Sequence, residues 1–153
     1  MIMESFIKYQ RLNGVLHGMM MLLLWGACDK TNNSVSLNLK AVIYAYENDT
    51  FQDVEYYAIH EIRHIFQHMK INELDEGINN GVEENLVKWW KYEEEHYIRV
   101  KDENGNVNDD YFKQDIEMDA YAFALAVMQY KYGTIDLYIP PIYGKEFYEI
   151  VDW

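Results

Sequence analysis

Residues 54–69 read VEYYAIHEIRHIFQHM, and this stretch decides both the predicted fold and the predicted site. Its apolar residues recur at helical spacing, and Asp53 stands where a helix N-cap is expected. We therefore predict an amphipathic helix over 54–69, with one side packed on the core. The residues of that core side are Ala58, Ile62, Ile65 and Met69. His60 and His64 are four residues apart, so both imidazoles project from a single face, which the helix can present to a cleft.

The same stretch contains an HExxH motif at residues 60–64. Two imidazoles one helical turn apart can bind one ion, and zinc accepts two imidazoles and a carboxylate while leaving a fourth position for water. Glu61 projects to the side of His60, so it can take a proton from that water without occupying a coordination position. The alternative interpretation is that His60 and His64 are ordinary polar neighbours on a helix.

A zinc site of this kind needs a third protein ligand, and the best candidate is Glu117, in EMDAYAFA at residues 117–124. Small residues on its face of the predicted helix allow close approach to the HExxH helix. The residues on the face of Glu117 are Ala120, Tyr121 and Ala124. Asp119 is the alternative ligand, and Tyr121 could hydrogen-bond a ligand or the bound water. Both carboxylates could instead be solvated charges on an amphipathic helix.

Other ligand patterns fit the sequence less well. The metzincin pattern requires glycine and histidine where this chain has Gln67 and Lys70. His68 lies two helical turns from His60, at about 12 Å, so both cannot bind one ion and His68 is expected at the surface or in a supporting role. Glu83 follows the motif but has bulky neighbours, which disfavour close helix packing.

HEIRHIFQ, followed downstream by an E-x-D-A-x-x-F-A helix, resembles the gluzincin metallopeptidases, and most closely the compact ImmA/IrrE-type proteins. The resemblance implies a minimal zincin core and a cytoplasmic, Zn²⁺-dependent peptidase that sometimes acts on transcriptional repressors. His60, His64 and Glu117 would then be the metal ligands. Glu61 would be the general base that activates a metal-bound water for hydrolysis of a peptide or protein substrate.

Three positions depart from that family pattern. Arg63 stands where glycine is common, Asp119 replaces a second glutamate, and Tyr121 replaces an asparagine. A donor to the developing oxyanion is also expected near the metal. Among the 14 tyrosines, Tyr57 and Tyr121 are our candidates for that catalytic role.

Composition limits the other functions. The chain has 153 residues and a net charge of −13, which disfavours binding to nucleic acid or to an anionic membrane. The lone Cys28 excludes an internal disulfide and a cysteine-rich zinc site. The apolar run VLHGMMMLLLW at residues 15–25 is too short to span a bilayer, so we expect a buried helix, no stable membrane insertion and a cytoplasmic protein. Export or lipid anchoring through residues 1–28 is the alternative.

We predict one zincin-like α+β domain over residues 1–153, rich in helix, with a small β-sheet, the HExxH helix and a downstream glutamate helix. The pattern predicts further helices over 3–26, 82–100 and 111–132, the last ending at Gly133, with a turn at 29–34 and a loop at 101–110. It predicts one or two strands over 35–46, whose edge could pair with an extended substrate.

The rival function is a non-catalytic binding module that uses its acidic surface to contact a protein partner. The sequence leaves the oligomeric state open.

Overall fold

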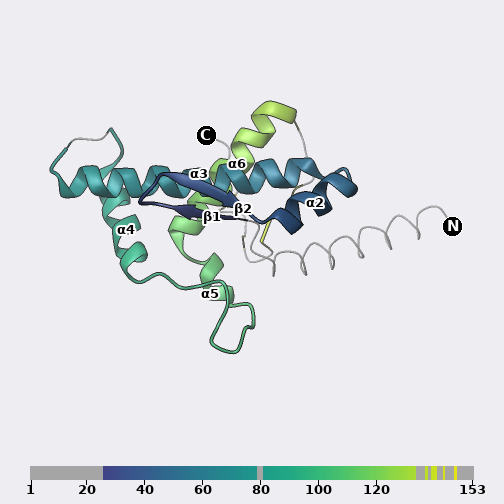
Figure 1. Ribbon diagram of the computed structural model, residues 1–153. Helices are drawn as coiled ribbons and strands as arrows, with labels where there is room; N and C mark the ends of the chain where they lie inside the picture. Colours follow the sequence, from purple (N-terminus) through teal and green to yellow (C-terminus); the bar gives the residue numbers. More distant parts are fainter. Residues whose placement is uncertain are drawn as a thin grey trace.

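The computed structural model describes residues 26–78, 81–133, 137, 139, 140, 143 and 147 of the chain. The described part is rich in helix and contains a two-stranded antiparallel sheet, which confirms the predicted α+β class (Figure 1). The predicted helix over 3–26 lies outside these residues, except for Gly26, which begins a strand.

The sheet is a hairpin of β1 (Gly26–Asp29) and β2 (Ser34–Leu37), in which Gly26 lies opposite Leu37. The Asp29 carboxylate accepts hydrogen bonds from the backbone N–H groups of Thr31 and Asn32, and Asn33 takes a positive φ of 49°. These are the features of a tight polar turn. The predicted turn at 29–34 is therefore confirmed.

The prediction of one or two strands over 35–46 is confirmed only for β2 and is wrong from Leu39 on, where α2 (Leu39–Glu47) is a helix. Asn38 begins it, because its side chain accepts a hydrogen bond from the backbone N–H of Lys40. Ala41 and Ala45, four residues apart, are fully buried on its inner face. The helical spacing of these two small residues decides the structure, and it overrides the β-branched composition that suggested a strand.

The central element is α3 (Phe51–Asp75), which packs against α2, α4 (Glu84–Glu95), α6 (Asp115–Tyr132) and both strands. It begins three residues earlier and ends six residues later than the predicted helix over 54–69. Thr50 holds the N-cap position, so the prediction of Asp53 as the cap is wrong, and Asp53 lies buried in the first turn. A charged residue in the first turn still favours the helix through its dipole.

The predicted core side of α3 is also wrong. Ile62 is 52% exposed and Met69 is 43% exposed, whereas His60, His64 and Gln67 are buried. The reason is that α6 packs along the histidine face and covers it. Gln67 donates hydrogen bonds to Ile116 and Asp119 of α6, and the two histidines face Glu117 of α6, so burial does not require the face to be apolar.

The predicted helix over 82–100 is shorter, as α4 (Glu84–Glu95), and Glu83 caps it by accepting from the N–H groups of Asn85 and Leu86. The predicted helix over 111–132 is two helices, α5 (Asp109–Phe112) and α6 (Asp115–Tyr132). The end of α6 at Gly133, where φ is 78°, confirms the predicted stop. Residues 101–108 form the predicted loop, closed by a bridge between Lys101 and Val107.

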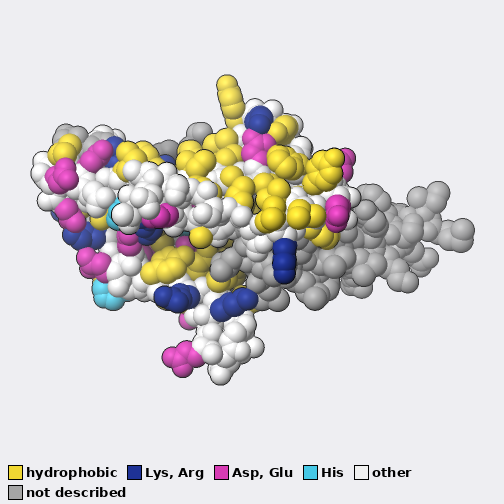
Figure 2. Space-filling view, viewed as in Figure 1, with side chains coloured by type: hydrophobic (Ala, Val, Ile, Leu, Met, Phe, Trp, Pro, Cys, Tyr) yellow, Lys and Arg dark blue, Asp and Glu magenta, His cyan; other side chains and the backbone are white. Residues whose placement is uncertain are grey.

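Two hydrophobic clusters hold α3 in place. The larger joins α2, the first half of α3 and α6, and the smaller joins Ile71 of α3 to Val87 and Trp90 of α4 and Ile116 of α6. Outside the core, Leu39, Ile43 and Tyr46 are exposed, and Figure 2 shows hydrophobic side chains gathered on the surface over α2 and the start of α3.

Candidate metal centre

Helix α3 supplies the first two residues of the site. His60 and His64 lie one turn apart and point toward α6, and their Nε2 atoms are 3.0 Å apart. Their rings meet edge to face, with centroids separated by 4.6 Å. Both side chains are buried. The helical spacing therefore brings the two imidazole nitrogens to one point, as the motif predicted.

The first turn of α6 supplies the third residue, Glu117. This turn is positioned by Glu93 of α4, whose two carboxylate oxygens accept the backbone N–H groups of Asp115 and Ile116 at 3.0 and 2.7 Å. Gln114, just before the helix, bonds both backbone groups of Ile98. These contacts fix where α6 begins and direct Glu117 toward α3.

The three side chains converge in the interior. Oε2 of Glu117 lies 3.3 Å from Nε2 of His60, and Oε1 lies 3.4 Å from Nε2 of His64. Glu117 is fully buried, and one ligand atom from each of the three residues lies within 4.8 Å of the others. The group of His60, His64 and Glu117 can hold a metal ion.

The chemistry of the cluster fits a bound cation. Among the described residues, Oε2 of Glu117 and Nδ1 of His60 are buried without a hydrogen-bond partner, although such atoms are costly to bury unpaired. Two imidazole nitrogens and a carboxylate, all able to donate electron pairs, face one another at close range. A proton or a metal cation between them removes the repulsion between these electron pairs.

The charged groups in the cluster shift one another's pKa values. Burial of Glu117 would by itself raise the pKa of its carboxyl, but the neighbouring imidazoles of His64 and His60 lower that pKa well below its ordinary value. Burial would lower the pKa of His64, but the Glu117 carboxylate raises it above the ordinary value. Glu117 is therefore the counter-charge that attracts a cation to the two imidazoles.

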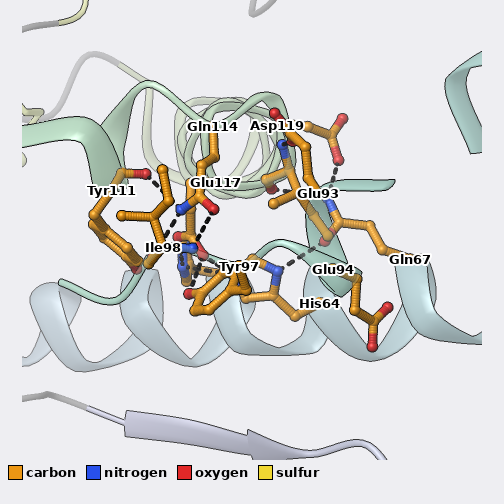
Figure 3. A network of polar contacts seen from close by, with 12 residues as sticks. His64, Gln67, Glu93, Glu94, Tyr97, Ile98, Tyr111, Gln114, Glu117 and Asp119 are labelled. Atoms are coloured by element: carbon orange, nitrogen blue, oxygen red, sulfur yellow. Dashed lines mark hydrogen bonds and ion pairs between the residues drawn. The ribbon is translucent and has the colours of Figure 1, made fainter. Parts of the chain in front are cut away.

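Tyr97, in the segment after α4, also contacts the cluster. Its hydroxyl donates a hydrogen bond to Oε1 of Glu117 at 2.5 Å, while 44% of the residue surface is exposed (Figure 3). Burial of the phenol and the Glu117 charge raise the pKa of Tyr97, so it stays a donor. Tyr111 packs edge to face on Tyr97. Sequence reasoning missed Tyr97, because nothing distinguishes it from the other tyrosines along the chain.

Glu61 lies on a different side of α3, toward the hairpin. A Cβ atom on Gly26 would lie 3.3 Å from Cγ of Glu61, so β1 runs directly over this side chain. No residue in the described part of the chain hydrogen-bonds the Glu61 carboxylate. Glu61 follows His60 along the helix and is half-buried. It does not belong to the group of His60, His64 and Glu117.

Asp119, the alternative ligand, lies away from the cluster. Its carboxylate accepts hydrogen bonds from Nε and Nη2 of Arg63, at 2.8 and 3.0 Å, and from the Gln67 side-chain amide at 2.7 Å. Gln67 in turn contacts Nδ1 of His64 at 2.7 Å. The structure therefore places Glu117, and not Asp119, beside the imidazoles.

The remaining candidates occupy other positions. Tyr121 is buried with its ring centroid 4.2 Å from that of His60, so it packs against a candidate ligand. Tyr57 packs on Tyr56, with ring centroids 5.4 Å apart. His68 pairs with Glu94 at 3.0 Å, outside the cluster, as its spacing predicted.

Cys28 of β1 is outside the cluster as well. Burial, together with the charge of Glu61, raises the pKa of its thiol to about 11, so it is a poor nucleophile at neutral pH.

Comparison of the chain with models of protein families, with curated proteins and with solved structures finds no match. Among the helices in the described ranges, none combines the length and the apolar character needed to cross a bilayer.

Proposed function

We propose that this protein is a zinc-dependent metallopeptidase of the gluzincin type, with His60, His64 and Glu117 as metal ligands and Glu61 as general base. The observation that carries the proposal is the burial of the three side chains at one point, with Glu61 next to His60 along α3. It agrees with the resemblance between this HExxH motif, with its downstream glutamate, and the gluzincin peptidases.

The donor set favours zinc over the common hard cations. Two imidazoles and one carboxylate suit Zn²⁺, whereas Ca²⁺ and Mg²⁺ prefer oxygen ligands throughout. Ligand atoms about 2.0–2.2 Å from a tetrahedral zinc are about 3.3 Å apart. The 3.3 Å between Oε2 of Glu117 and Nε2 of His60 matches that spacing, and the two Nε2 atoms, 3.0 Å apart, are slightly closer than it.

Each residue has a task in the proposed hydrolysis. Bound zinc would supply a Lewis acid that polarises the scissile carbonyl and lowers the pKa of water. Glu61, free of hydrogen bonds from the described residues, accepts the proton of the attacking water and passes it to the leaving amine. Tyr97 holds Glu117 and also reaches solvent, which makes it a better candidate than Tyr57 or Tyr121 for contact with a substrate.

The test uses the full chain with Glu61→Gln, beside Glu76→Gln at the exposed end of α3 as a matched control. Zinc content is measured by atomic absorption, and hydrolysis is measured with fluorescein-labelled casein and with a peptide mixture read by mass spectrometry. We expect stoichiometric zinc in all three proteins, hydrolysis by the parent and by Glu76→Gln, and a loss of at least about 1,000-fold in Glu61→Gln.

Three results contradict the proposal. Full activity in Glu61→Gln rejects the assigned base. Stoichiometric zinc with no hydrolysis of any probe by the parent protein favours the rival, a non-catalytic binding module. Absence of zinc after metal is supplied during folding rejects the metal site itself.

A further inference from the structure

The side-chain amide of Gln67 has one possible orientation. One end lies 3.0 Å from the Ile116 carbonyl oxygen and 2.7 Å from Oδ2 of Asp119, and both of those atoms can only accept hydrogen bonds. That end must be the NH₂ group. The other end is therefore the carbonyl oxygen, and it lies 2.7 Å from Nδ1 of His64 (Figure 3). Gln67 is fully buried, so water cannot substitute for either contact.

This orientation determines where His64 carries its proton. Because the Gln67 oxygen only accepts, Nδ1 of His64 must donate, and neutral His64 then has its lone pair on Nε2. That nitrogen faces Nε2 of His60 and the Glu117 carboxylate. The opposite tautomer would leave Nδ1 and the Gln67 oxygen as two acceptors in contact, and it would direct a proton into the position of the ion.

Gln67 is itself held in place from α6. Both oxygens of Asp119 are bonded to Arg63, and the Arg63 guanidinium lies 4.7 Å from the Phe66 ring and 4.8 Å from the Phe123 ring. One aromatic ring from each helix thus holds the Arg63 guanidinium in place, and the guanidinium in turn holds the Asp119 carboxylate. His60 has no corresponding partner in the described part of the chain, because its Nδ1 is among the buried unpaired atoms.

We propose that Arg63, Asp119 and Gln67 are positioning residues that act in series to select the Nδ1–H tautomer of His64 and thereby make Nε2 its ligand atom. The metal role of this tautomer rests on the function proposed above, whereas the tautomer itself does not. None of the three positioning residues belongs to the group of His60, His64 and Glu117. Their contribution is to the affinity for the ion and not to the chemical step.

The test compares Gln67→Met with Ile71→Met, one turn further along the same buried face of α3. Long-range ¹H–¹⁵N correlation spectra of metal-free protein, at a pH above the histidine titrations, report which nitrogen of His64 is protonated. We expect the Nδ1–H form in the parent and in Ile71→Met, and a substantial Nε2–H population in Gln67→Met. Zinc affinity, measured by chelator competition, should fall about 10- to 100-fold in Gln67→Met and stay within about twofold in Ile71→Met.

The outcomes separate this inference from the proposed function. An Nε2–H form in the parent, or an unchanged tautomer in Gln67→Met, overturns the inference. If the parent has the Nδ1–H form but binds no zinc, the proposed function fails and the tautomer selection stands. Should Gln67→Met fail to fold, Asp119→Ala supplies the answer, because it removes one of the two acceptors of the Gln67 NH₂ group and leaves the Ile116 carbonyl. We then expect a smaller but detectable Nε2–H population, and a tautomer identical to that of the parent overturns the inference.

Discussion

Glu117 is fully buried, and its two oxygens have different surroundings. Oε1 accepts the Tyr97 hydroxyl, whereas Oε2 has no hydrogen-bond partner within the described ranges and faces His60. This asymmetry makes Oε2 the better ligand atom, because coordination there costs no existing hydrogen bond. Tyr97 would then orient the carboxylate.

Replacement of Tyr97 with phenylalanine tests this role. The variant removes the donor but keeps the ring, so we expect the affinity for zinc to fall roughly 10-fold. We also expect the metal-free protein to lose about 1.5–3 kcal/mol of unfolding free energy, since the lost bond is to a charged group. Tyr92→Phe, at an exposed position on α4, is the control. Equal zinc affinities in the two variants would contradict the orienting role.

At the scale of elements, the site depends on how closely α6 approaches α3. Ala120 and Ala124 are fully buried, three and seven residues after Glu117, on its face of the helix. A methyl group at each position keeps the helix axes close, and the Glu117 side chain then reaches the imidazoles. The small residues that the sequence pattern singled out therefore lie where the prediction needs them.

Enlarging one of these residues should separate the two helices. We expect Ala120→Leu to lower the free energy of unfolding by about 1–3 kcal/mol through overpacking. Zinc affinity should fall by a larger factor than in any surface variant, because Glu117 moves with α6. Gln129→Leu, exposed on the same helix, is the matched control for both denaturant titration and zinc competition. A stable Ala120→Leu with unchanged zinc affinity would refute this account of the packing.

The sequence predicted the presence of these helices better than it predicted where they begin and end. Local patterns suffice where the signal is local, as in the His60–His64 spacing and the Gly133 stop. They fail where tertiary contacts decide. The break between α5 and α6 arises because the Gln114 side chain bonds Ile98, which lies 16 residues away. No periodicity within residues 111–132 could indicate such a contact.

The convergence of the three candidate ligands was predictable, but most of their supporting groups were not. His60 and His64 follow from one turn of helix, and Glu117 follows from the small residues around it. Arg63 was visible only as a departure from a family pattern, and Asp119 as a departure and as the alternative ligand. The structure shows that they pair with each other. Gln67 could have been found, because it lies three residues after His64 on the same face of α3.

At the scale of the whole molecule, a net charge of −13 opposes the compact state, and the buried cluster responds to pH. In the metal-free protein the raised pKa of His64 stabilises the fold below the ordinary value of 6.5, and this stabilisation is lost as pH rises through the folded value. The lowered pKa of Glu117 stabilises the fold above the ordinary value of 4.5, and this is lost as pH falls through the folded value. Both contributions are complete only between these two ordinary values.

Zinc should reverse the loss of stability that follows when pH rises through the pKa of His64, because the ion replaces the proton on the imidazoles. At zinc concentrations about 100 times the Kd, we expect stabilisation of about 2.7 kcal/mol, or roughly 5–10 °C in Tm. The increment should grow from about pH 6 to about pH 8 as proton competition weakens. Thermal melts with Zn²⁺ and with Mg²⁺ measure it. An increment that shrinks with rising pH, or an equal one with Mg²⁺, would contradict the assignment.

The order of the candidate ligands along the chain has a consequence for synthesis. Two of them stand at positions 60 and 64 and the third at 117, so 52 residues must be translated after the second before the third exists. A nascent chain that has emerged only as far as α4 offers a pair of imidazoles and no counter-charge between them. A cation could therefore be held by all three residues only late in biogenesis, after α6 has docked on α3.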